Sequence, residues 1–289
     1  GEALGANTTA SFNNALGYRA LCSNTTGTQN TAIGTCSMRI NTTGSNNTAV
    51  GIDALENNTT AANNTAVGTN ALGANTTGTN SVAVGRSALC SNTTATNTAV
   101  GVCALLTTTT SGNNTAVGFC ALKTTSTDCN AAFGTNALRD QTTGGCNTAV
   151  GSSAGLRTTT GAENTAVGKS ALFANITGGQ NTALGALALD ANTTGSQNVG
   201  LGNETLGTNT TGATNVAVGF AALNANTTAS ANTAIGHRSL QANTTAANNT
   251  AIGFCSLSAN TTASANTAVG TNALKTTTTG AENTAVGVG

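Results

Sequence analysis

The feature that most constrains the fold of this chain is a five-residue segment, Asn-Thr-Ala-Val-Gly, that returns at near-constant spacing from one end to the other. A representative copy occupies residues 47–51. The last glycine of each copy, called the anchor glycine below, stands at positions 17, 34, 51, 68, 85, 101, 118, 134, 151, 168, 185, 202, 219, 236, 253, 270 and 287. Fourteen of the sixteen intervals are 17 residues long and two are 16. A period of this length is typical of a solenoid, in which each repeat forms one coil that stacks on its neighbours.

Apolar and polar positions keep their phase in the repeats. The residue before the anchor glycine is Val, Ile, Leu or Phe in all seventeen copies, and the residue before that is Ala in sixteen, with Gly200 as the exception. Leu or Met stands four residues after the glycine in fifteen of sixteen copies, with Gly155 as the exception. A chain with 6% charged and 2% aromatic residues resembles a disordered segment in composition. Disorder gives no reason for Val and Leu to stay in phase, so we expect a folded repeat.

A repeat of 17 residues is too short for two helices and a turn, and it carries Gly and β-branched residues where a helix would be destabilised. We predict an all-β fold, a parallel β-solenoid (β-roll or β-helix) of about 17 coils with 16–17 residues and two short strands per coil. The first strand is the Asn-Thr-Ala-Val segment, and the second is the segment around the Ala-Leu pair, as at residues 54–55. With about 4.8 Å between stacked strands, the coils would form a rod about 80 Å long. We treat residues 1–289 as a single repeat domain, continuous as a solenoid, and expect it to be a segment of a longer fibre.

The charged residues mark the expected surface of the coil. They fall one, two, five, six or ten positions after the anchor glycine or five before it, as with Arg86 and Glu163. They avoid the Asn-Thr-Ala-Val-Gly segment and the Ala-Leu pair, so we expect these positions to face a stacked interior and the charges to lie on a solvated rim. The Val before the glycine is thus expected in the core or at an interface. Because each coil offers only about two large apolar residues, some Val or Leu side chains are left to face a neighbouring chain.

Glycine and asparagine have distinct expected roles. The anchor glycine is never replaced, which indicates a positive φ or a very close approach of backbones. The position ten residues later is Gly in nine repeats and Ala in six, which indicates a turn that merely prefers Gly. The residue four before the anchor is Asn in sixteen copies, with Ser81 as the exception. Stacked Asn side chains can bond up and down a ladder of identical residues, and we expect such a ladder here.

The eight cysteines fall at three positions of the repeat, so coil geometry proposes disulfides. The candidate pairs are Cys22 with Cys36, Cys90 with Cys103, and Cys129 with Cys146. Cys129 and Cys146 occupy the same position on successive coils, where Cα atoms about 5 Å apart would suit a disulfide. Cys120 stacks above Cys103 and competes for it, and Cys255 has no partner nearby. Free thiols are the alternative. Disulfides would indicate an oxidising compartment. No histidine accompanies the cysteines, so we expect no metal site.

Asn-Thr-Thr or Asn-Ile-Thr triplets, each an N-glycosylation acceptor, recur along the chain. The candidate asparagines are Asn7, Asn24, Asn41, Asn58, Asn75, Asn92, Asn175, Asn192, Asn209, Asn226, Asn243 and Asn260. Two interpretations are open: partial glycosylation, or a turn in which Asn begins the bend and Thr extends a ladder. Glycans on coils about 5 Å apart would crowd each other, which disfavours uniform occupancy.

Several other functions find little support in the sequence. Thr ladders on a flat solenoid resemble ice-binding proteins, but those use Thr-x-Thr, whereas an adjacent Thr-Thr pair points to alternate faces of a strand. The single histidine, His237, falls on the charged rim, where we expect an exposed surface residue. The carboxylates are scattered singly, and no nucleophile, base and orienting group recur together, so we expect no enzyme and no cofactor. The formal net charge of zero gives no support for a nucleic-acid partner. No apolar run approaches the roughly 20 residues of a membrane span.

The repeat resembles two kinds of surface protein. The variant at residues 80–85, Asn-Ser-Val-Ala-Val-Gly, is similar to the head repeats of trimeric autotransporter adhesins. The longer unit, Asn-Thr-Ala-Val-Gly-x-x-Ala-Leu-x-x-Asn-Thr-Thr-Gly, looks more like repeats of phage tail-fibre and large surface proteins. The resemblance covers essentially the whole chain and implies a parallel β-roll, frequently trimeric, in an extracellular fibre. The repeat is longer than the adhesin repeat, and no coiled-coil stalk, membrane anchor or receptor-binding tip occurs in these residues.

Two functional hypotheses follow. The first is a structural rod in an extracellular fibre or filament, on a cell surface, in a secreted fibre or on a virion. Because both ends look like interior repeats, we expect self-association, either end-to-end stacking or a homotrimer. The second is a surface adhesin or tail-fibre binding module, which would need a non-repeating patch such as Tyr18-Arg19 or His237-Arg238.

Overall fold

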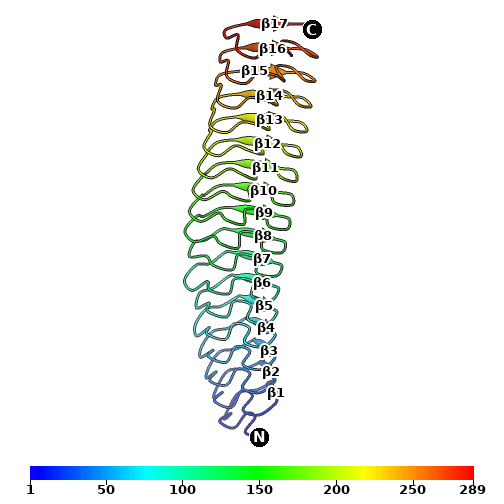
Figure 1. Ribbon diagram of the computed structural model, residues 1–289. Helices are drawn as coiled ribbons and strands as arrows, with labels where there is room; N and C mark the ends of the chain where they lie inside the picture. Colours follow the sequence, from blue (N-terminus) through cyan, green and yellow to red (C-terminus); the bar gives the residue numbers. More distant parts are fainter. The chain divides into compact units, whose positions relative to one another are not determined.

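The computed structural model describes residues 1–289 and confirms the all-β parallel solenoid (Figure 1). It contains seventeen strands of three residues in a single parallel sheet, and no helix. Among the strands of residues 1–143, and likewise among those of residues 144–289, consecutive strands pair in register, so that Thr31 lies on Thr48 and Ala32 on Ala49. The strands are β1 (Asn14–Leu16), β2 (Thr31–Ile33), β3 (Thr48–Val50), β4 (Thr65–Val67), β5 (Val82–Val84), β6 (Thr98–Val100), β7 (Thr115–Val117), β8 (Ala131–Phe133), β9 (Thr148–Val150), β10 (Thr165–Val167), β11 (Thr182–Leu184), β12 (Val199–Leu201), β13 (Val216–Val218), β14 (Thr233–Ile235), β15 (Thr250–Ile252), β16 (Thr267–Val269) and β17 (Thr284–Val286).

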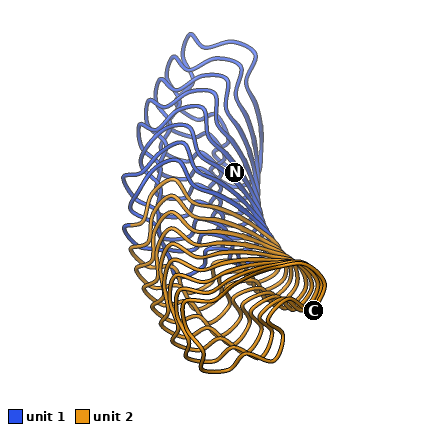
Figure 2. Cartoon of the chain, turned by 90° about the horizontal axis from the view of Figure 1, so that it is seen from above, with its two compact units in different colours: residues 1–143 blue, residues 144–289 orange.

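The chain divides into two compact units, Gly1–Thr143 with β1–β8 and Gly144–Gly289 with β9–β17. Figure 2 shows that successive coils within each unit have nearly the same outline and are displaced from one another like the leaves of a fan. Each unit is therefore a stack of similar coils. Every feature described below is placed within one unit.

The strand of each coil presents its middle residue to the interior and the other two to the outside. In β14, Ala234 is fully buried, whereas Thr233 is half-buried and Ile235 is 38% exposed. This alternation follows from the period of two along a strand, which places neighbouring side chains on opposite faces. Of the two alternatives predicted for the residue before the anchor glycine, core or interface, the structure excludes the core. The alanine beside it occupies the interior, and the larger aliphatic side chain faces outward.

The second predicted strand is also wrong. Around the Ala-Leu pair at residues 54–55 the backbone is not extended, because Asp53 and Leu55 have φ angles of 56° and 51°, in the left-handed region. The coils nevertheless bond to each other here: Leu55 N–H donates to Ala71 O at 3.0 Å, and Asp53 N–H donates to Thr35 O at 3.0 Å. A strand would send Ala54 and Leu55 to opposite faces, yet both are fully buried. The alternating backbone lets two adjacent side chains point into the same narrow core.

Two columns of asparagine fill the polar half of the interior and confirm the predicted amide ladder. Asn30 and Asn41 of one coil both donate Nδ2–H to Gly44 O, at 2.8 and 3.0 Å. The columns also bond between coils: Asn47 N–H donates to Asn30 Oδ1 at 3.0 Å, and Asn41 Nδ2–H donates to Asn24 Oδ1 at 2.8 Å. Buried amides are stable when their groups have hydrogen-bond partners. The interior is thus an apolar strip of Ala and Leu beside a hydrogen-bonded strip of Asn.

The anchor glycine satisfies both parts of its prediction. Gly219 has a φ of 121°, and a Cβ placed on it would lie 2.7 Å from the carbonyl carbon and oxygen of Gly236 in the next coil. Side chains are excluded by the conformation and by the close stacking of backbones at this corner. This explains why the chain tolerates no other residue at the seventeen equivalent positions.

Candidate functional site: the outward face of the sheet

The candidate glycosylation residues lie inside the coils and not on their surface. Asn7 is half-buried, and the other eleven are fully buried: Asn24, Asn41, Asn58, Asn75, Asn92, Asn175, Asn192, Asn209, Asn226, Asn243 and Asn260. Their amide nitrogens are engaged as well, since Asn226 Nδ2–H donates to Asn209 Oδ1 at 2.8 Å and to Ala229 O at 3.0 Å. A glycan on Nδ2 would need space and a free N–H direction that this position lacks. The structure therefore favours the interpretation of the triplets as turn and ladder residues.

The residue after these asparagines is threonine in every case except Ile176, and it extends the ladder on the coil surface. Thr42 Oγ1–H donates to Thr59 O at 3.1 Å, and Thr227 Oγ1–H donates to Thr244 O at 3.1 Å in the second unit. The hydroxyl protons of this column are thus committed to bonds between coils. They hold the stack together, and they are not free to recognise a ligand as donors.

The eight cysteines are present as thiols, and none of the candidate disulfides is formed. Cys22 Sγ–H donates to Arg39 O at 3.3 Å, and Cys90 Sγ accepts from Asn70 Nδ2–H at 3.0 Å. Cys103 and Cys120 stand two residues after successive anchor glycines. Burial, followed by the proximity of Cys103, raises the pKa of the Cys120 thiol. The structure therefore brings Cys103 to Cys120, the competing partner in the sequence prediction.

His237 is exposed, in keeping with its prediction as a rim residue, but it is not isolated. Its ring stacks between Phe220 and Phe254 of the adjacent coils, with ring centroids 5.4 and 5.2 Å apart. The Arg238 guanidinium lies 6.0 Å from the centroid of Phe220. The three residues are 17 positions apart in the sequence, so the repeat period alone could have predicted that their rings stack. Phe220 and Phe254 are 42% and 50% exposed, which makes the stack a local aromatic feature of the surface.

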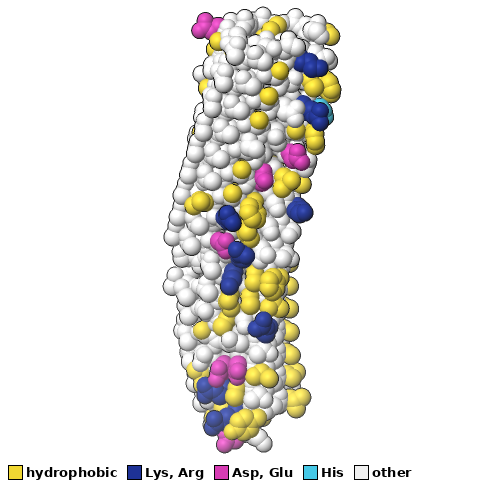
Figure 3. Space-filling view, in the orientation of Figure 1, with side chains coloured by type: hydrophobic (Ala, Val, Ile, Leu, Met, Phe, Trp, Pro, Cys, Tyr) yellow, Lys and Arg dark blue, Asp and Glu magenta, His cyan; other side chains and the backbone are white.

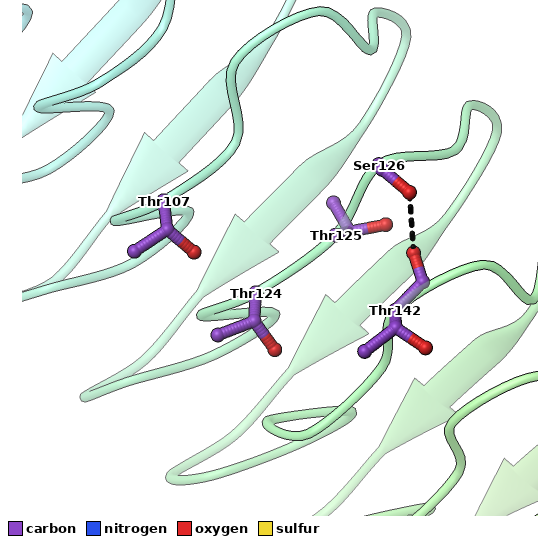
Figure 4. Close-up of a pocket in the computed structure, with 5 residues that line it drawn as sticks. All are labelled: Thr107, Thr124, Thr125, Ser126 and Thr142. Carbon is purple, nitrogen blue, oxygen red and sulfur yellow. Dashed lines mark hydrogen bonds between the residues drawn. The ribbon is translucent and has the colours of Figure 1, made fainter.

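A hollow of about 260 Å³ lies on the surface of the first unit (Figure 4). It is lined by Thr107, Thr124, Thr125, Ser126 and Thr142. Three of the lining hydroxyls donate to carbonyls of the following coil: Thr107 to Lys123 O at 3.2 Å, Thr124 to Arg139 O at 3.1 Å, and Ser126 to Thr142 O at 2.9 Å. Figure 4 shows the Ser126 bond across the gap between two coils. The lining has no ionisable side chain, so the hollow itself supplies no general base that could activate its hydroxyls.

The charged residues lie on the rim, as predicted. Arg39 and Glu56, at equivalent positions of neighbouring coils, form an ion pair at 2.9 Å, and Arg19 pairs with Glu2 at 3.1 Å. Pairs this exposed contribute little to stability. No three His, Cys, Asp or Glu side chains gather in a group able to hold a metal ion. The structure has no helix long and apolar enough to cross a membrane.

The surface feature that recurs in every coil is the aliphatic residue at the end of each strand. We call this column the outward ladder: Leu16, Ile33, Val50, Val67, Val84, Val100, Val117 and Phe133 in the first unit, and Val150, Val167, Leu184, Leu201, Val218, Ile235, Ile252, Val269 and Val286 in the second. None of these side chains is buried. In register pairing stacks them, as Val218 on Ile235 and Ile235 on Ile252. Figure 3 shows apolar side chains following the stack, with charges beside them.

Comparisons by sequence add no relative: no family model matches the chain, and no curated protein matches it. The fold and the outward ladder are therefore the basis for a functional assignment.

Proposed function

We propose that this chain is a structural rod module of an extracellular fibre or filament, and that it assembles with further copies of itself. The observation that carries the proposal is the uniformity of the stack. Within each unit, each strand pairs in register with the next, so one coil is the template for another, and the surface hollow is lined by no ionisable side chain. A periodic scaffold of this kind is suited to spanning distance.

Two further observations support this proposal. Within each unit the coils are joined by backbone, amide and hydroxyl hydrogen bonds, as a rod built from stacked coils requires. The repeat also resembles those of trimeric autotransporter adhesin heads in its Asn-Ser-Val-Ala-Val-Gly variant at residues 80–85, and those of phage tail-fibre and large surface proteins in its longer unit. That resemblance is the basis for placing the chain outside the cell, at a cell surface, in a secreted fibre or on a virion.

Electron microscopy of the purified chain tests the proposal. We expect rods whose length grows in multiples of one molecule as the concentration is raised, because the strand edge of a terminal coil can accept another strand. Compact particles that stay monomeric at high concentration would contradict it.

A binding module is the second candidate, and the ring stack of Phe220, His237 and Phe254 is the observation that favours it. Exposed aromatic side chains are frequent in recognition surfaces. A module of this kind would bind a receptor or surface glycan at the stack and lose that binding when both phenylalanines become alanine. Glycan-array binding that depends on Phe220 and Phe254 would raise this candidate above the rod.

A further inference from the structure

We propose that two neighbouring turns of the first unit form a hinge, which opens at the turns while the sheet of the same coils stays joined. The turns are residues 108–113 and 125–129, and together they are called the short-turn seam below. The Asp128 side chain holds the seam closed. The inference goes beyond the proposed function, because it concerns motion within one chain and does not depend on assembly.

The seam arises from a difference in length between stacked turns. The two intervals of 16 residues are Gly85–Gly101 and Gly118–Gly134. In the second of them the turn is one residue shorter than the turn of the coil before it, 125–129 against 108–113. Hydrogen bonds between stacked coils join equivalent positions of the backbone. The shorter turn therefore cannot supply a partner for every residue of the longer one.

A turn that is followed by one of equal length shows which bonds are lost. In the turn at residues 41–46, the N–H groups of residues 42–44 all donate to Thr59 O, at 2.9, 3.2 and 3.3 Å. At the seam, the N–H groups of residues 109–111 have no acceptor in the following coil. The two turns of the seam are therefore joined by fewer backbone bonds than ordinary turns.

The amide ladder is interrupted at the same place. In ordinary coils an asparagine begins the turn and bonds to its equivalent, as when Asn58 Nδ2–H donates to Asn41 Oδ1 at 2.7 Å. Thr108 and Thr125 take this position at the seam. Thr108 is fully buried, and its Oγ1 has no hydrogen-bond partner. A buried hydroxyl without a partner destabilises the closed turn, and water satisfies that hydroxyl when the turn opens.

The other short interval shows that an asparagine can compensate for the lost bonds. The N–H groups of residues 76–77 also lack an acceptor in the following, shorter turn. There Asn75 Oδ1 accepts Gly78 N–H at 3.1 Å, and Asn75 Nδ2–H donates to Asn58 Oδ1 at 3.2 Å. A threonine carries no amide, and the side chain of Thr108 makes neither bond. We therefore expect opening at the short-turn seam and not at the other short interval.

One hydrogen bond joins residues 108–113 to residues 125–129. Gly112 N–H donates to Asp128 Oδ1 at 2.8 Å, and Asp128 is exposed. An exposed carboxylate can exchange this partner for water without a change in the interior. The surface hollow lies at the same turns, since Thr125 and Ser126 line it (Figure 4). The seam thus combines a contact that can be released with free space beside it.

The sheet side of the same coils keeps its bonds. Strands β7 and β8 pair in register, and Thr115 N–H donates to Asn130 O at 2.9 Å. Asn130 N–H donates to Asn114 Oδ1 at 3.0 Å. The core segments are joined as well, since Leu105 N–H donates to Ala121 O at 3.1 Å. A coil that is bonded at its sheet and core but not at its turn can open on one side only, which is the arrangement of a hinge.

Hydrogen exchange resolved to single amides tests the hinge in the native full chain at low concentration. Thr107 and Ile40 occupy equivalent positions beside their turns, and their N–H groups donate to Lys123 O and Glu56 O at 3.0 and 3.2 Å. These bonds alone predict equal protection. Opening of the seam predicts that Thr107 exchanges at least about tenfold faster than Ile40, relative to the unfolded chain, while Thr115 on the sheet side stays protected.

Two variants change the seam in opposite directions. Asp128→Ala removes the bond to Gly112 and should speed exchange at Thr107 by about threefold or more. The matched control is Asp140→Ala, which removes a partly exposed aspartate of the next coil that pairs with Arg139 outside the seam, and it should leave Thr107 unchanged.

The repair variant combines Thr108→Asn and Thr125→Asn with one glycine inserted between Thr127 and Asp128. It restores both the length of the turn and the amide ladder. Exchange at Thr107 should slow to the rate of Ile40.

Equal exchange of Thr107 and Ile40 in the native chain overturns the inference. Exchange of Thr115 as fast as Thr107 overturns it too, because the whole coil would then open. If the repair variant does not fold, the native comparison and Asp128→Ala decide. Micrographs of the native chain bear on the proposed function alone: an absence of rods together with fast exchange at Thr107 removes the rod and supports the hinge.

Discussion

The amide ladder gives the most quantitative prediction, and Asn215 is a suitable position because all its bonds are defined. Asn215 is fully buried. Its Oδ1 accepts the backbone N–H of Asn232 at 3.0 Å, and its Nδ2–H donates to Ala229 O at 2.8 Å. In Asn215→Ala the N–H of Asn232 is left without an acceptor. Ala229 O keeps its second donor, Asn226 Nδ2, at 3.0 Å.

The expected cost follows chiefly from these two losses. The variant also loses the bonds from Asn215 Nδ2–H to Asn198 Oδ1 at 3.1 Å and from Asn232 Nδ2–H to Asn215 Oδ1 at 3.3 Å, but Asn198 Oδ1 and Asn232 Nδ2 each keep another partner. One buried donor without a partner costs about 1–3 kcal/mol, and one lost hydrogen bond at a carbonyl that keeps another costs about 0.5–1.5 kcal/mol. We therefore expect Asn215→Ala to lower the free energy of unfolding by about 2–4 kcal/mol. Asn215→Ser should cost less, about 1 kcal/mol, because a hydroxyl restores the acceptor. The chain supplies the precedent, since Ser81 Oγ accepts Asn97 N–H at 3.4 Å at the equivalent position.

Urea denaturation of the three chains, with hydrogen exchange read over residues 210–240, measures the effect. Exchange in that segment should accelerate by about tenfold for each 1.4 kcal/mol lost. The reasoning is refuted if Asn215→Ala is as stable as the native chain, or if Asn215→Ser is as damaging as Asn215→Ala.

Three further predictions concern single residues. Gly219→Ala should destabilise the second unit by about 3 kcal/mol or more, because its Cβ meets the backbone of Gly236 and its φ is positive. Gly179→Ala, at a turn position that holds Ala162 in the preceding coil and where a Cβ would come no closer than 3.1 Å to another atom, should melt within a few degrees of the native chain. Burial raises the pKa of Asp190, so the folded chain holds this proton at a pH where the unfolded chain has released it, and stability falls as pH rises from the ordinary pKa of Asp to the raised value. Asp190→Asn should therefore raise the free energy of unfolding near pH 7 and leave it unchanged near pH 3, as measured by urea titration. A loss of stability at both pH values would show instead that the Asp190 carboxyl group stabilises the fold. Diamide, which takes up two hydrogen atoms from a thiol pair, should link Cys103 to Cys120 as their proximity implies, and peptide mapping that instead finds Cys90 joined to Cys103 would contradict this.

The sequence predicted the features that depend on period and backbone chemistry. The parallel stack, the positive φ of the anchor glycine and the Asn ladder follow from which residues recur and which never change. Each of these features depends on residues within one coil or at equivalent positions of adjacent coils. Because the repeat shows the same residue at each equivalent position, a single sequence was enough to predict them.

The errors arose where two apolar residues are neighbours in the chain. The Val of the Ala-Val pair was predicted to lie in the core or at an interface, but strand alternation can bury only one of the two residues inside the coil, and Ala234 is buried while Ile235 is exposed. The Ala-Leu pair was taken as a strand, but both residues are buried, which requires the left-handed φ of residues such as Leu223. Non-glycine residues rarely adopt that conformation, so propensity gave no signal for it. The ring stack at His237 was present in the 17-residue spacing and was missed because the rim was considered only for its charges.

The measurement that tests the central claim most directly is thiol labelling of two neighbouring residues in β14. Ala234→Cys and Ile235→Cys are made in a chain whose native cysteines are replaced by serine, and maleimide labelling is followed in dilute solution. A sheet that buries its alanine and exposes its ladder predicts rapid labelling at residue 235 and at least about tenfold slower labelling at residue 234. Rapid labelling at 234 with protection at 235 in dilute solution would place the aliphatic side chain inside the coil and contradict both the strand orientation and the outward ladder.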